Sequence, residues 1–251
     1  MHRTILISLA TATTFLQANA QAKCSKVADV NTTVNPLVPF RPNTATFPCD
    51  MGIPIPLGKV PTGCAKFEII VARGTSEPGD LGMIVGDPLV ARVKRDMPGV
   101  DVRGYPVQYP ASRNTTSAPS GAQDVQNRLI AQMKECPDEK FALVGYSQGG
   151  RVVSMATNRM NATLSKNILA VVLYGAGLGN ATGSLSGITL ANCAPGDIAC
   201  SDSGTGAGHV SYNNEGTVWH DRTSQYIVAA FNGKPVEQKG PKLVRNPTGG
   251  L

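Results

Sequence analysis

The chain has 251 residues and a formal net charge of +6, and its length suits a single domain. Much of the positive excess lies near the C-terminus, where Lys234, Lys239, Lys242 and Arg245 stand among glycine and proline residues. This tail has no aromatic side chain that could stack on a base, and its composition is typical of a solvated linker. The composition of the tail that carries the charge therefore argues against a nucleic-acid-binding protein.

The first 22 residues have the pattern of a secretory signal peptide. Arg3 precedes an apolar stretch that runs to Leu16, and overlapping A-x-A sites predict cleavage after Ala20 or Ala22. The stretch is shorter than the roughly 20 apolar residues that a membrane span requires. Since no later segment is apolar over such a length, the sequence predicts an exported chain without a membrane span.

The composition divides the chain into four regions. Residues 1–22 are the predicted signal peptide, 23–63 a proline-rich extension, 64–232 the main domain and 233–251 a flexible basic tail. The extension shows little periodicity, so we expect irregular chain without a catalytic residue there. Sequons predict glycosylation in a eukaryotic host at Asn31, Asn114, Asn161 and Asn180.

Six cysteines remain after residue 22, and an even number in an oxidising compartment predicts three disulfides. The sequence alone permits about 15 pairings. A metal site is the poorer interpretation, because no C-x-x-C pair occurs and the few histidines lack ligand spacing. We expect neither a metal nor another cofactor. The six are Cys24, Cys49, Cys64, Cys136, Cys193 and Cys200.

Strand and helix patterns alternate after the extension. Short apolar runs predict strands at 67–72, at 100–105, from Phe141, at 168–174 and at 188–191. Apolar residues at helical spacing predict helices at 82–97, from 118 or 121 to 135, from Arg151, and at 217–231. The alternation predicts an α/β fold in three layers, with a small central parallel sheet and helices on both faces.

A G-x-S-x-G pattern stands between the strand that begins at Phe141 and the helix that begins at Arg151. Its members are Gly145, Ser147 and Gly149. A strand, a tight turn with a central serine and a helix are typical of the nucleophile elbow, which exposes the serine hydroxyl above the sheet edge. The N–H of the next residue, Gln148, then faces the oxygen that becomes an oxyanion during acyl transfer.

A serine hydroxyl is a poor nucleophile unless a base removes its proton and a third group orients that base. His209 lies in a glycine-rich loop, where a flexible backbone could bring its imidazole over the sheet edge, whereas His220 lies in the last helix. We favour His209 as the base. As the acid we favour Asp197, which a local disulfide would hold, over the freer Asp202. The order serine, aspartate, histidine is that of the α/β-hydrolases.

Four motifs between about residues 64 and 231 together are specific. They are Ala72-Arg73-Gly74-Thr75-Ser76-Glu77-Pro78-Gly79, Gly145-Tyr146-Ser147-Gln148-Gly149, Gly196-Asp197-Ile198-Ala199-Cys200 and His209-Val210-Ser211-Tyr212. With them the chain resembles the cutinases, secreted lidless serine esterases of the α/β-hydrolase fold. The resemblance implies a triad of Ser147, Asp197 and His209. It also implies an oxyanion hole formed by the N–H and hydroxyl of Thr75 with the N–H of Gln148.

The resemblance extends to the disulfides and the substrate. It implies bridges Cys64–Cys136 and Cys193–Cys200, which leaves Cys24 to pair with Cys49. We expect a secreted monomer that hydrolyses cutin or small acyl esters through an acyl-enzyme.

The chain departs from the resemblance beside the histidine. Many cutinases have bulky aliphatic residues there, whereas this chain has glycine-rich residues 203–208, which predicts a weak grip on long acyl chains. The run Tyr109-Pro110-Ala111 resembles a sequence found in the related acetylxylan esterases. Deacetylation of a plant cell-wall polysaccharide is therefore an alternative function. A catalytically inactive surface-binding or elicitor protein is a second alternative.

Overall fold

The computed structural model describes residues 57–176, 183–200 and 204–234. Within these ranges no helix has the length and apolar character needed to cross a bilayer. Several sequence predictions lie outside the described residues: the signal peptide, most of the proline-rich extension, most of the basic tail, the pair Cys24–Cys49, and Asn31, Asn180 and Asp202.

Five parallel strands form the central sheet in the order β2-β1-β3-β4-β5. They alternate with helices along the chain, as the sequence predicts, and the three inner strands β1, β3 and β4 are almost entirely buried because both of their faces are covered. The strands are β1 (Phe67–Ala72), β2 (Val102–Pro106), β3 (Lys140–Tyr146), β4 (Ile168–Tyr174) and β5 (Thr189–Asn192).

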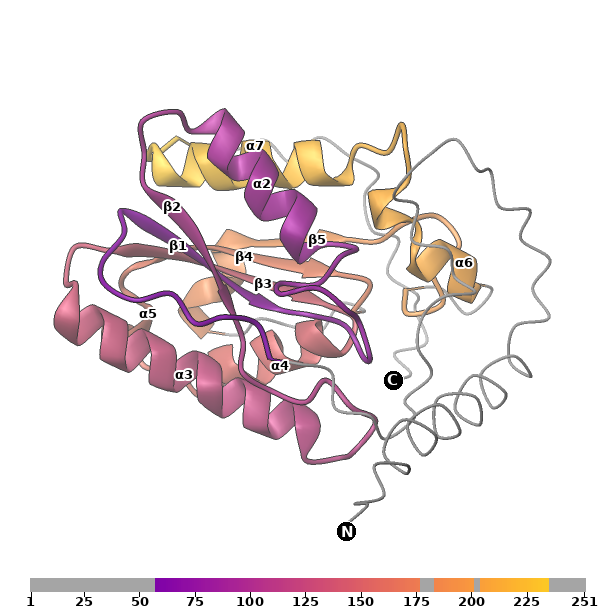
Figure 1. The fold of residues 1–251 in the computed structure, drawn as a ribbon, viewed down its shortest axis with the longest axis horizontal. Coiled ribbons are helices and arrows are strands. Elements are labelled where there is room, and N and C mark those ends of the chain that lie inside the picture. Colours follow the sequence, from indigo (N-terminus) through magenta and orange to yellow (C-terminus); the bar gives the residue numbers. More distant parts are fainter. Residues whose placement is uncertain (1–56, 177–182, 201–203, 235–251) are drawn as a thin grey trace, which may run out of the picture.

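Helices cover both faces of the sheet and complete the predicted three layers (Figure 1). One face carries α2 (Gly86–Asp96) and α7 (Trp219–Phe231), and the other carries α3 (Ser117–Glu135) and α4 (Gln148–Thr157). Alternation along the strands explains the division, because Ile69 packs into the α2/α7 layer and its neighbour Ile70 into the α3/α4 layer. Short helical segments complete the described chain: α5 (Ala162–Ser165), η2 (Gly183–Ile188), α6 (Gly206–His209) and η3 (Ser211–Asn213).

The helix predicted at 82–97 begins later, at Gly86. Gly79 and Gly82 have φ angles of +96° and +97°, in the left-handed region that glycine adopts readily and that a helix excludes. The side chain of Asp87 then accepts a hydrogen bond from the N–H of Leu81 at 3.2 Å. Residues 79–85 are therefore a turn, which the apolar spacing alone did not reveal.

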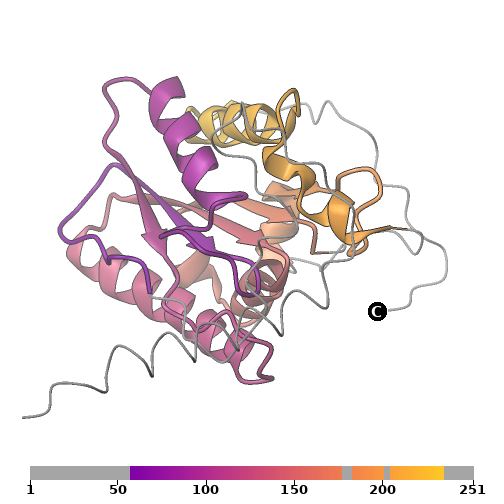
Figure 2. The same ribbon diagram turned by 45° about the vertical axis from the view of Figure 1, so that its right-hand side comes forward.

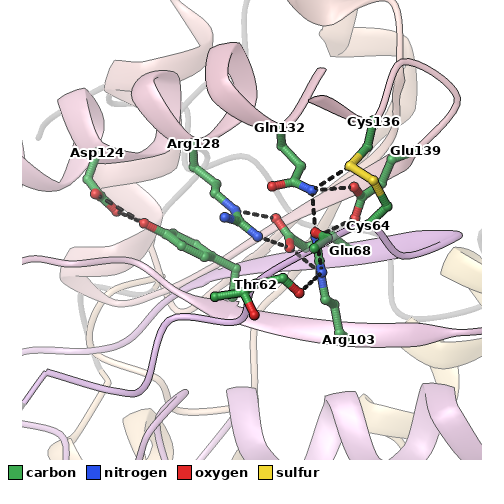
Figure 3. Close-up of polar contacts among 11 residues, drawn as sticks. Thr62, Cys64, Glu68, Arg103, Asp124, Arg128, Gln132, Cys136 and Glu139 are labelled. Carbon is green, nitrogen blue, oxygen red and sulfur yellow. Dashed lines mark hydrogen bonds and ion pairs between the residues drawn. A yellow bond between two sulfur atoms is a disulfide. The ribbon is translucent and has the colours of Figure 1, made fainter. Parts of the chain in front are cut away.

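An ion-pair network lies where the strands begin (Figure 3). Glu68, the second residue of β1, has a fully buried side chain and accepts hydrogen bonds from Arg103 of β2 and Arg128 of α3, each at 2.6 Å. The guanidinium of Arg128 also lies over the ring of Tyr105, 4.6 Å from its centroid. The buried carboxylate thus has two cationic partners, which offset its loss of hydration.

The same network reaches the first disulfide. Arg103 donates to Glu139 at 2.9 Å, and Gln132 donates to the other carboxylate oxygen of Glu139 at 2.8 Å and contacts Cys136 Sγ at 3.1 Å (Figure 3). Cys136 is bonded to Cys64, just before β1. The disulfide and the network together attach the chain that enters β1 to the end of α3.

Candidate active site

Ser147 lies in the turn between β3 and α4. Its φ of 53° and ψ of −118° place it in the left-handed half of the backbone map, a strained conformation for a residue with a side chain. Its N–H donates to the carbonyl of Tyr174 in β4 at 2.8 Å. A Cβ at Gly145 would overlap the carbonyl of Gly149, and a Cβ at Gly149 would overlap the carbonyl of Ala72. The two glycines are therefore needed for this turn to close.

Three side chains from distant parts of the chain meet above this turn. His209 Nε2 lies 2.8 Å from Ser147 Oγ, and His209 Nδ1 lies 2.7 Å from Asp197 Oδ1. The Asp197 side chain is fully buried, whereas that of His209 is 19% exposed. A continuous hydrogen-bonded chain thus runs from a buried carboxylate through an imidazole to a half-buried hydroxyl. The structure brings together the three residues that the sequence analysis selected.

Several donors surround the Asp197 carboxylate. Beside His209, the N–H of Ala199 donates to Oδ1 at 2.7 Å, and the hydroxyl of Tyr212 donates to Oδ2. Burial disfavours the charged carboxylate, but the hydrogen bonds from His209 and Tyr212 outweigh it and hold the pKa of Asp197 below its usual value. Asp197 is therefore ionised over the ordinary pH range and can orient the imidazole of His209.

The bend that carries Asp197 is closed by a disulfide between Cys193 and Cys200. The carbonyl of Asp197 accepts the N–H of Cys200 at 3.0 Å, and the N–H of Asp197 donates to the carbonyl of Ala194 at 3.0 Å. The disulfide and these backbone bonds hold the carboxylate in a compact turn.

The glycine-rich segment before His209 differs from the flexible loop that the sequence predicts. Residues Gly206–His209 form the short helix α6, in which the hydroxyl of Thr205 accepts the N–H of Gly208 at 3.3 Å. A Cβ at Gly204 or Gly208 would overlap the backbone of residues 196–198. Gly204 and Gly208 therefore allow close backbone packing against the Asp197 turn. Helix α6 lies beyond one end of the sheet (Figures 1 and 2).

The second histidine lies elsewhere. His220 is in the first turn of α7, where its Nδ1 is 3.5 Å from the hydroxyl of Tyr174 and burial lowers its pKa to about 4. It lines a polar cleft of about 330 Å³ between α2 and the start of α7. None of Ser147, Asp197 and His209 lines this cleft, so the cleft is separate from the hydrogen-bonded chain.

The turn after β1 lies beside the serine turn. Ala72 at the end of β1 pairs with Gly145, and the half-buried Thr75 follows three residues later. Gln148 is the first residue of α4, so its N–H has no acceptor within the helix. Its side chain is held by the carbonyl of Ser112 at 2.7 Å and the hydroxyl of Ser117 at 3.0 Å.

The sequence analysis did not single out two residues that contact the candidate site, although both lie in motifs that carry the resemblance. Buried Glu77 accepts the N–H of Gly74 at 2.6 Å and the N–H of Ile84 at 2.7 Å, so it fixes the turn that contains Thr75. Burial, partly offset by these bonds, raises its pKa to about 7. The second such residue is Tyr212, whose hydroxyl donates to Asp197 Oδ2. The sequence could not show which groups these side chains contact.

A parallel sheet covered on both faces, with a serine on the turn from a central strand to a helix, defines the α/β-hydrolase class. The cutinase family model matches residues 63–231, more than half of the chain. The protein therefore belongs to the cutinase family and is a carboxylic ester hydrolase of the α/β-hydrolase fold.

Similar proteins agree with this assignment. Carboxylesterase Culp1 of Mycobacterium tuberculosis is 32% identical over 183 residues, which cover 67% of this chain and 82% of the relative. A Trichoderma reesei cutinase, solved with a phosphonate inhibitor, has a TM-score of 0.60 at 22% identity over 90% of this chain and 93% of its own. The catalytic core of acetyl xylan esterase from Trichoderma reesei has a TM-score of 0.55 at 17% identity, over 69% of this chain and 100% of its own.

Proposed function

We propose that this protein is a secreted serine esterase that acts through an acyl-enzyme, with Ser147 as nucleophile, His209 as general base and Asp197 as the residue that orients His209. The observation that carries the proposal is the hydrogen-bonded chain of 2.8 and 2.7 Å from Ser147 Oγ through the imidazole to Asp197. Such a chain gives a serine hydroxyl the base that it lacks by itself.

The geometry supports a two-stage reaction. Ser147 Oγ attacks the ester carbonyl carbon while its proton passes to His209 Nε2, and the resulting imidazolium is stabilised by the Asp197 carboxylate. The tetrahedral intermediate collapses, and the imidazolium returns the proton to the departing alkoxide, so that an alcohol leaves. Water then repeats the sequence on the acyl-enzyme: His209 accepts its proton, the carbonyl carbon is attacked, and Ser147 leaves with a proton as the free acid forms.

Thr75 and Gln148 are the proposed oxyanion hole. The N–H of Gln148 stands at the positive end of α4 and the strained Ser147 turn fixes its direction. The hydroxyl and N–H of Thr75 would complete the site from the neighbouring turn. Glu77 supports this role, because it ties the N–H groups on both sides of Thr75's turn to a single buried carboxylate.

The proposed substrates are cutin or short-chain acyl esters. Ile198, next to Asp197, has 59% of its surface exposed and is the large apolar side chain on the Asp197 turn. The glycines of α6 add no apolar surface of their own. The arrangement therefore suits a small acyl group better than a long one.

Deacetylation of a plant cell-wall polysaccharide is the second candidate function, favoured by the run Tyr109-Pro110-Ala111. Tyr109 itself is buried, and its hydroxyl donates to the carbonyl of Arg73, so that this run supports the turn beside the proposed oxyanion hole. Hydrolysis of p-nitrophenyl esters from acetate to palmitate, measured beside acetate release from acetylated xylan, separates the two functions. Faster turnover of acetylated xylan than of any p-nitrophenyl ester would favour the second.

Labelling by a fluorophosphonate separates an active esterase from an inactive surface-binding protein of the same fold. We expect one equivalent of label on the wild-type protein and none on Ser147→Ala. An unlabelled wild-type protein that still binds cutin or cell walls would favour the inactive alternative. For secretion, N-terminal sequencing of the protein from a eukaryotic host's medium should find a chain that begins at Gln21 or Lys23.

A further inference from the structure

Tyr212 makes a contact that the three-residue mechanism does not include. Its ring is fully buried and its hydroxyl donates to Oδ2 of Asp197, while His209 occupies Oδ1. The tyrosine hydroxyl also accepts the N–H of Ala194 at 3.1 Å. The hydroxyl oxygen thus accepts the hydrogen bond from Ala194, and the hydroxyl proton is donated to the carboxylate. The carbonyl of Asn192, at 3.4 Å, is a more distant acceptor than the carboxylate.

The ring of Tyr212 has little freedom to move. Three aromatic rings pack against it edge-on: that of Tyr146 with centroids 5.9 Å apart, that of Tyr174 at 5.3 Å and that of Trp219 at 5.7 Å. Edge-to-face pairs at these distances are favourable and directional. The hydroxyl is therefore a donor in a fixed position, and the pKa of Tyr212 is raised, mainly by burial and then by its hydrogen bond to Asp197, so that it keeps its proton.

Tyr212 and His209 belong to one short stretch of chain. His209 ends α6 and Tyr212 lies in η3, three residues later. The two side chains hydrogen-bond to the two oxygens of the same carboxylate, so the position of Asp197 is fixed relative to His209. Resting on the function proposed above, we propose that Tyr212 is a positioning residue for the esterase reaction, which orients the Asp197 carboxylate and shares its negative charge.

The charge that Tyr212 shares determines how strongly Asp197 stabilises the imidazolium of His209. The titratable groups that face the carboxylate are His209 from α6, Tyr212 from η3 and Tyr146 from β3. The pKa of Tyr146 is raised by burial first, and then by the charges of Glu77 and Asp197. Removal of the Tyr212 hydroxyl would leave more negative charge facing His209. The imidazolium that forms in the reaction would then be stabilised more strongly, and the acid limb of kcat/KM would move to higher pH.

Tyr212→Phe tests this with hydrolysis of p-nitrophenyl acetate, and fluorophosphonate titration counts the active sites so that kcat refers to folded enzyme. We expect kcat to fall about ten-fold with KM within about two-fold, and the acid limb of kcat/KM to move up by roughly half a pH unit or more. Tyr174→Phe is the matched control, since it removes another buried hydroxyl from the same aromatic cluster, one that donates to Thr223 at 2.6 Å. Its acid limb should coincide with that of the wild type.

A second variant keeps the shape of the side chain and should move the acid limb of kcat/KM in the opposite direction. With 3-fluorotyrosine at position 212 the hydroxyl is a stronger donor, so the acid limb should move down. An acid limb that stays with the wild type in both variants, even where kcat falls, would mean that Tyr212 only packs. Failure of the proposed function itself is distinguishable, because the wild type would then show no hydrolysis that Ser147→Ala abolishes.

Discussion

The backbone of Gly175 lies directly against the carboxylate of Asp197. A Cβ built on Gly175 would lie 2.5 Å from Asp197 Oδ2 and 2.9 Å from His209 Nδ1. The φ of Gly175 is also +50°, which disfavours any side chain. The end of β4 thus leaves room for the acid and the base only because this residue is glycine.

Gly175→Ala should therefore lower kcat by about 100-fold or more, because the methyl group must displace the carboxylate or the imidazole from its position. The measurement is kcat on p-nitrophenyl acetate, corrected for the number of active sites by fluorophosphonate titration. Gly187→Ala is the control, since a Cβ there would meet nothing within 4 Å, and it should keep the wild-type rate. Equal rates in the two variants would show that the Asp197–His209 contact is looser than the structure indicates.

Ser147→Ala should remove ester hydrolysis by several orders of magnitude without unfolding the protein, because it deletes the nucleophile at a half-exposed turn. His209→Ala should be comparably severe. His220→Ala should keep most of the activity, since His220 lies in α7 beside the polar cleft and contacts none of the three residues. The rates of the three variants on one short-chain ester test this. A larger loss in His220→Ala than in His209→Ala would show that His209 is not the base.

His220 should make folding stability depend on pH. Its pKa is about 4 in the folded protein because of burial, against about 6.5 when exposed. Since the folded pKa is lowered, the unfolded state binds the proton more readily, and stability is lost as pH falls from about 6.5 to 4. The loss attributable to this group is at most about 3 kcal/mol. Urea unfolding at pH 7 and pH 4.5 should show a smaller difference for His220→Gln than for the wild type.

Glu77 acts in the same pH range with the opposite sign, so the comparison must be made between variants. Burial raises the pKa of Glu77 in the folded protein from its ordinary value of 4.5 to about 7, so its contribution to stability is lost as pH rises from about 4.5 to 7. The difference between wild type and His220→Gln cancels this contribution, because both proteins retain Glu77. If the two proteins lost the same free energy of unfolding between pH 7 and 4.5, the protonation of His220 would not be coupled to folding.

The two disulfides should have separable effects. Cys64–Cys136 joins residues 72 apart, and removal of both cysteines should cost about 4 kcal/mol of stability in the chain-entropy model. Cys193–Cys200 joins residues only 7 apart, and its removal should lower kcat more than stability, because it closes the turn that holds Asp197. Urea unfolding and kcat on each Cys→Ala pair test this. A double variant of the second pair with wild-type kcat would show that the backbone bonds alone hold the carboxylate.

The sequence predicted the sheet because each strand is a short apolar run. It predicted the meeting of Ser147, Asp197 and His209 because only two histidines follow the predicted signal peptide, and because the local disulfide and the cutinase resemblance favoured Asp197 as the acid. The prediction was wrong at the glycine-rich segment, because glycine is common both in flexible loops and where two backbones pack closely. The glycines of residues 204–208 suggested a flexible loop, whereas Gly204 and Gly208 permit close packing against the Asp197 turn. It also missed Glu77 and Tyr212, because a side chain that supports a site through hydrogen bonds leaves no spacing signal. Their partners lie on segments whose approach depends on tertiary structure.

Acyl-chain length should reveal how the α6 glycines affect substrate choice. Because these glycines present no side chain, a long acyl chain gains little apolar contact there, and each CH₂ that stays hydrated forgoes about 0.8 kcal/mol. We expect the highest kcat/KM for acetate to hexanoate esters, a decline beyond them, and no rise in rate above the substrate's solubility limit. Ile198→Ala, which removes the exposed apolar side chain on the Asp197 turn, should weaken hexanoate more than acetate. Maximal activity on palmitate would instead show that other residues form an acyl groove and that the glycine-rich segment does not limit chain length.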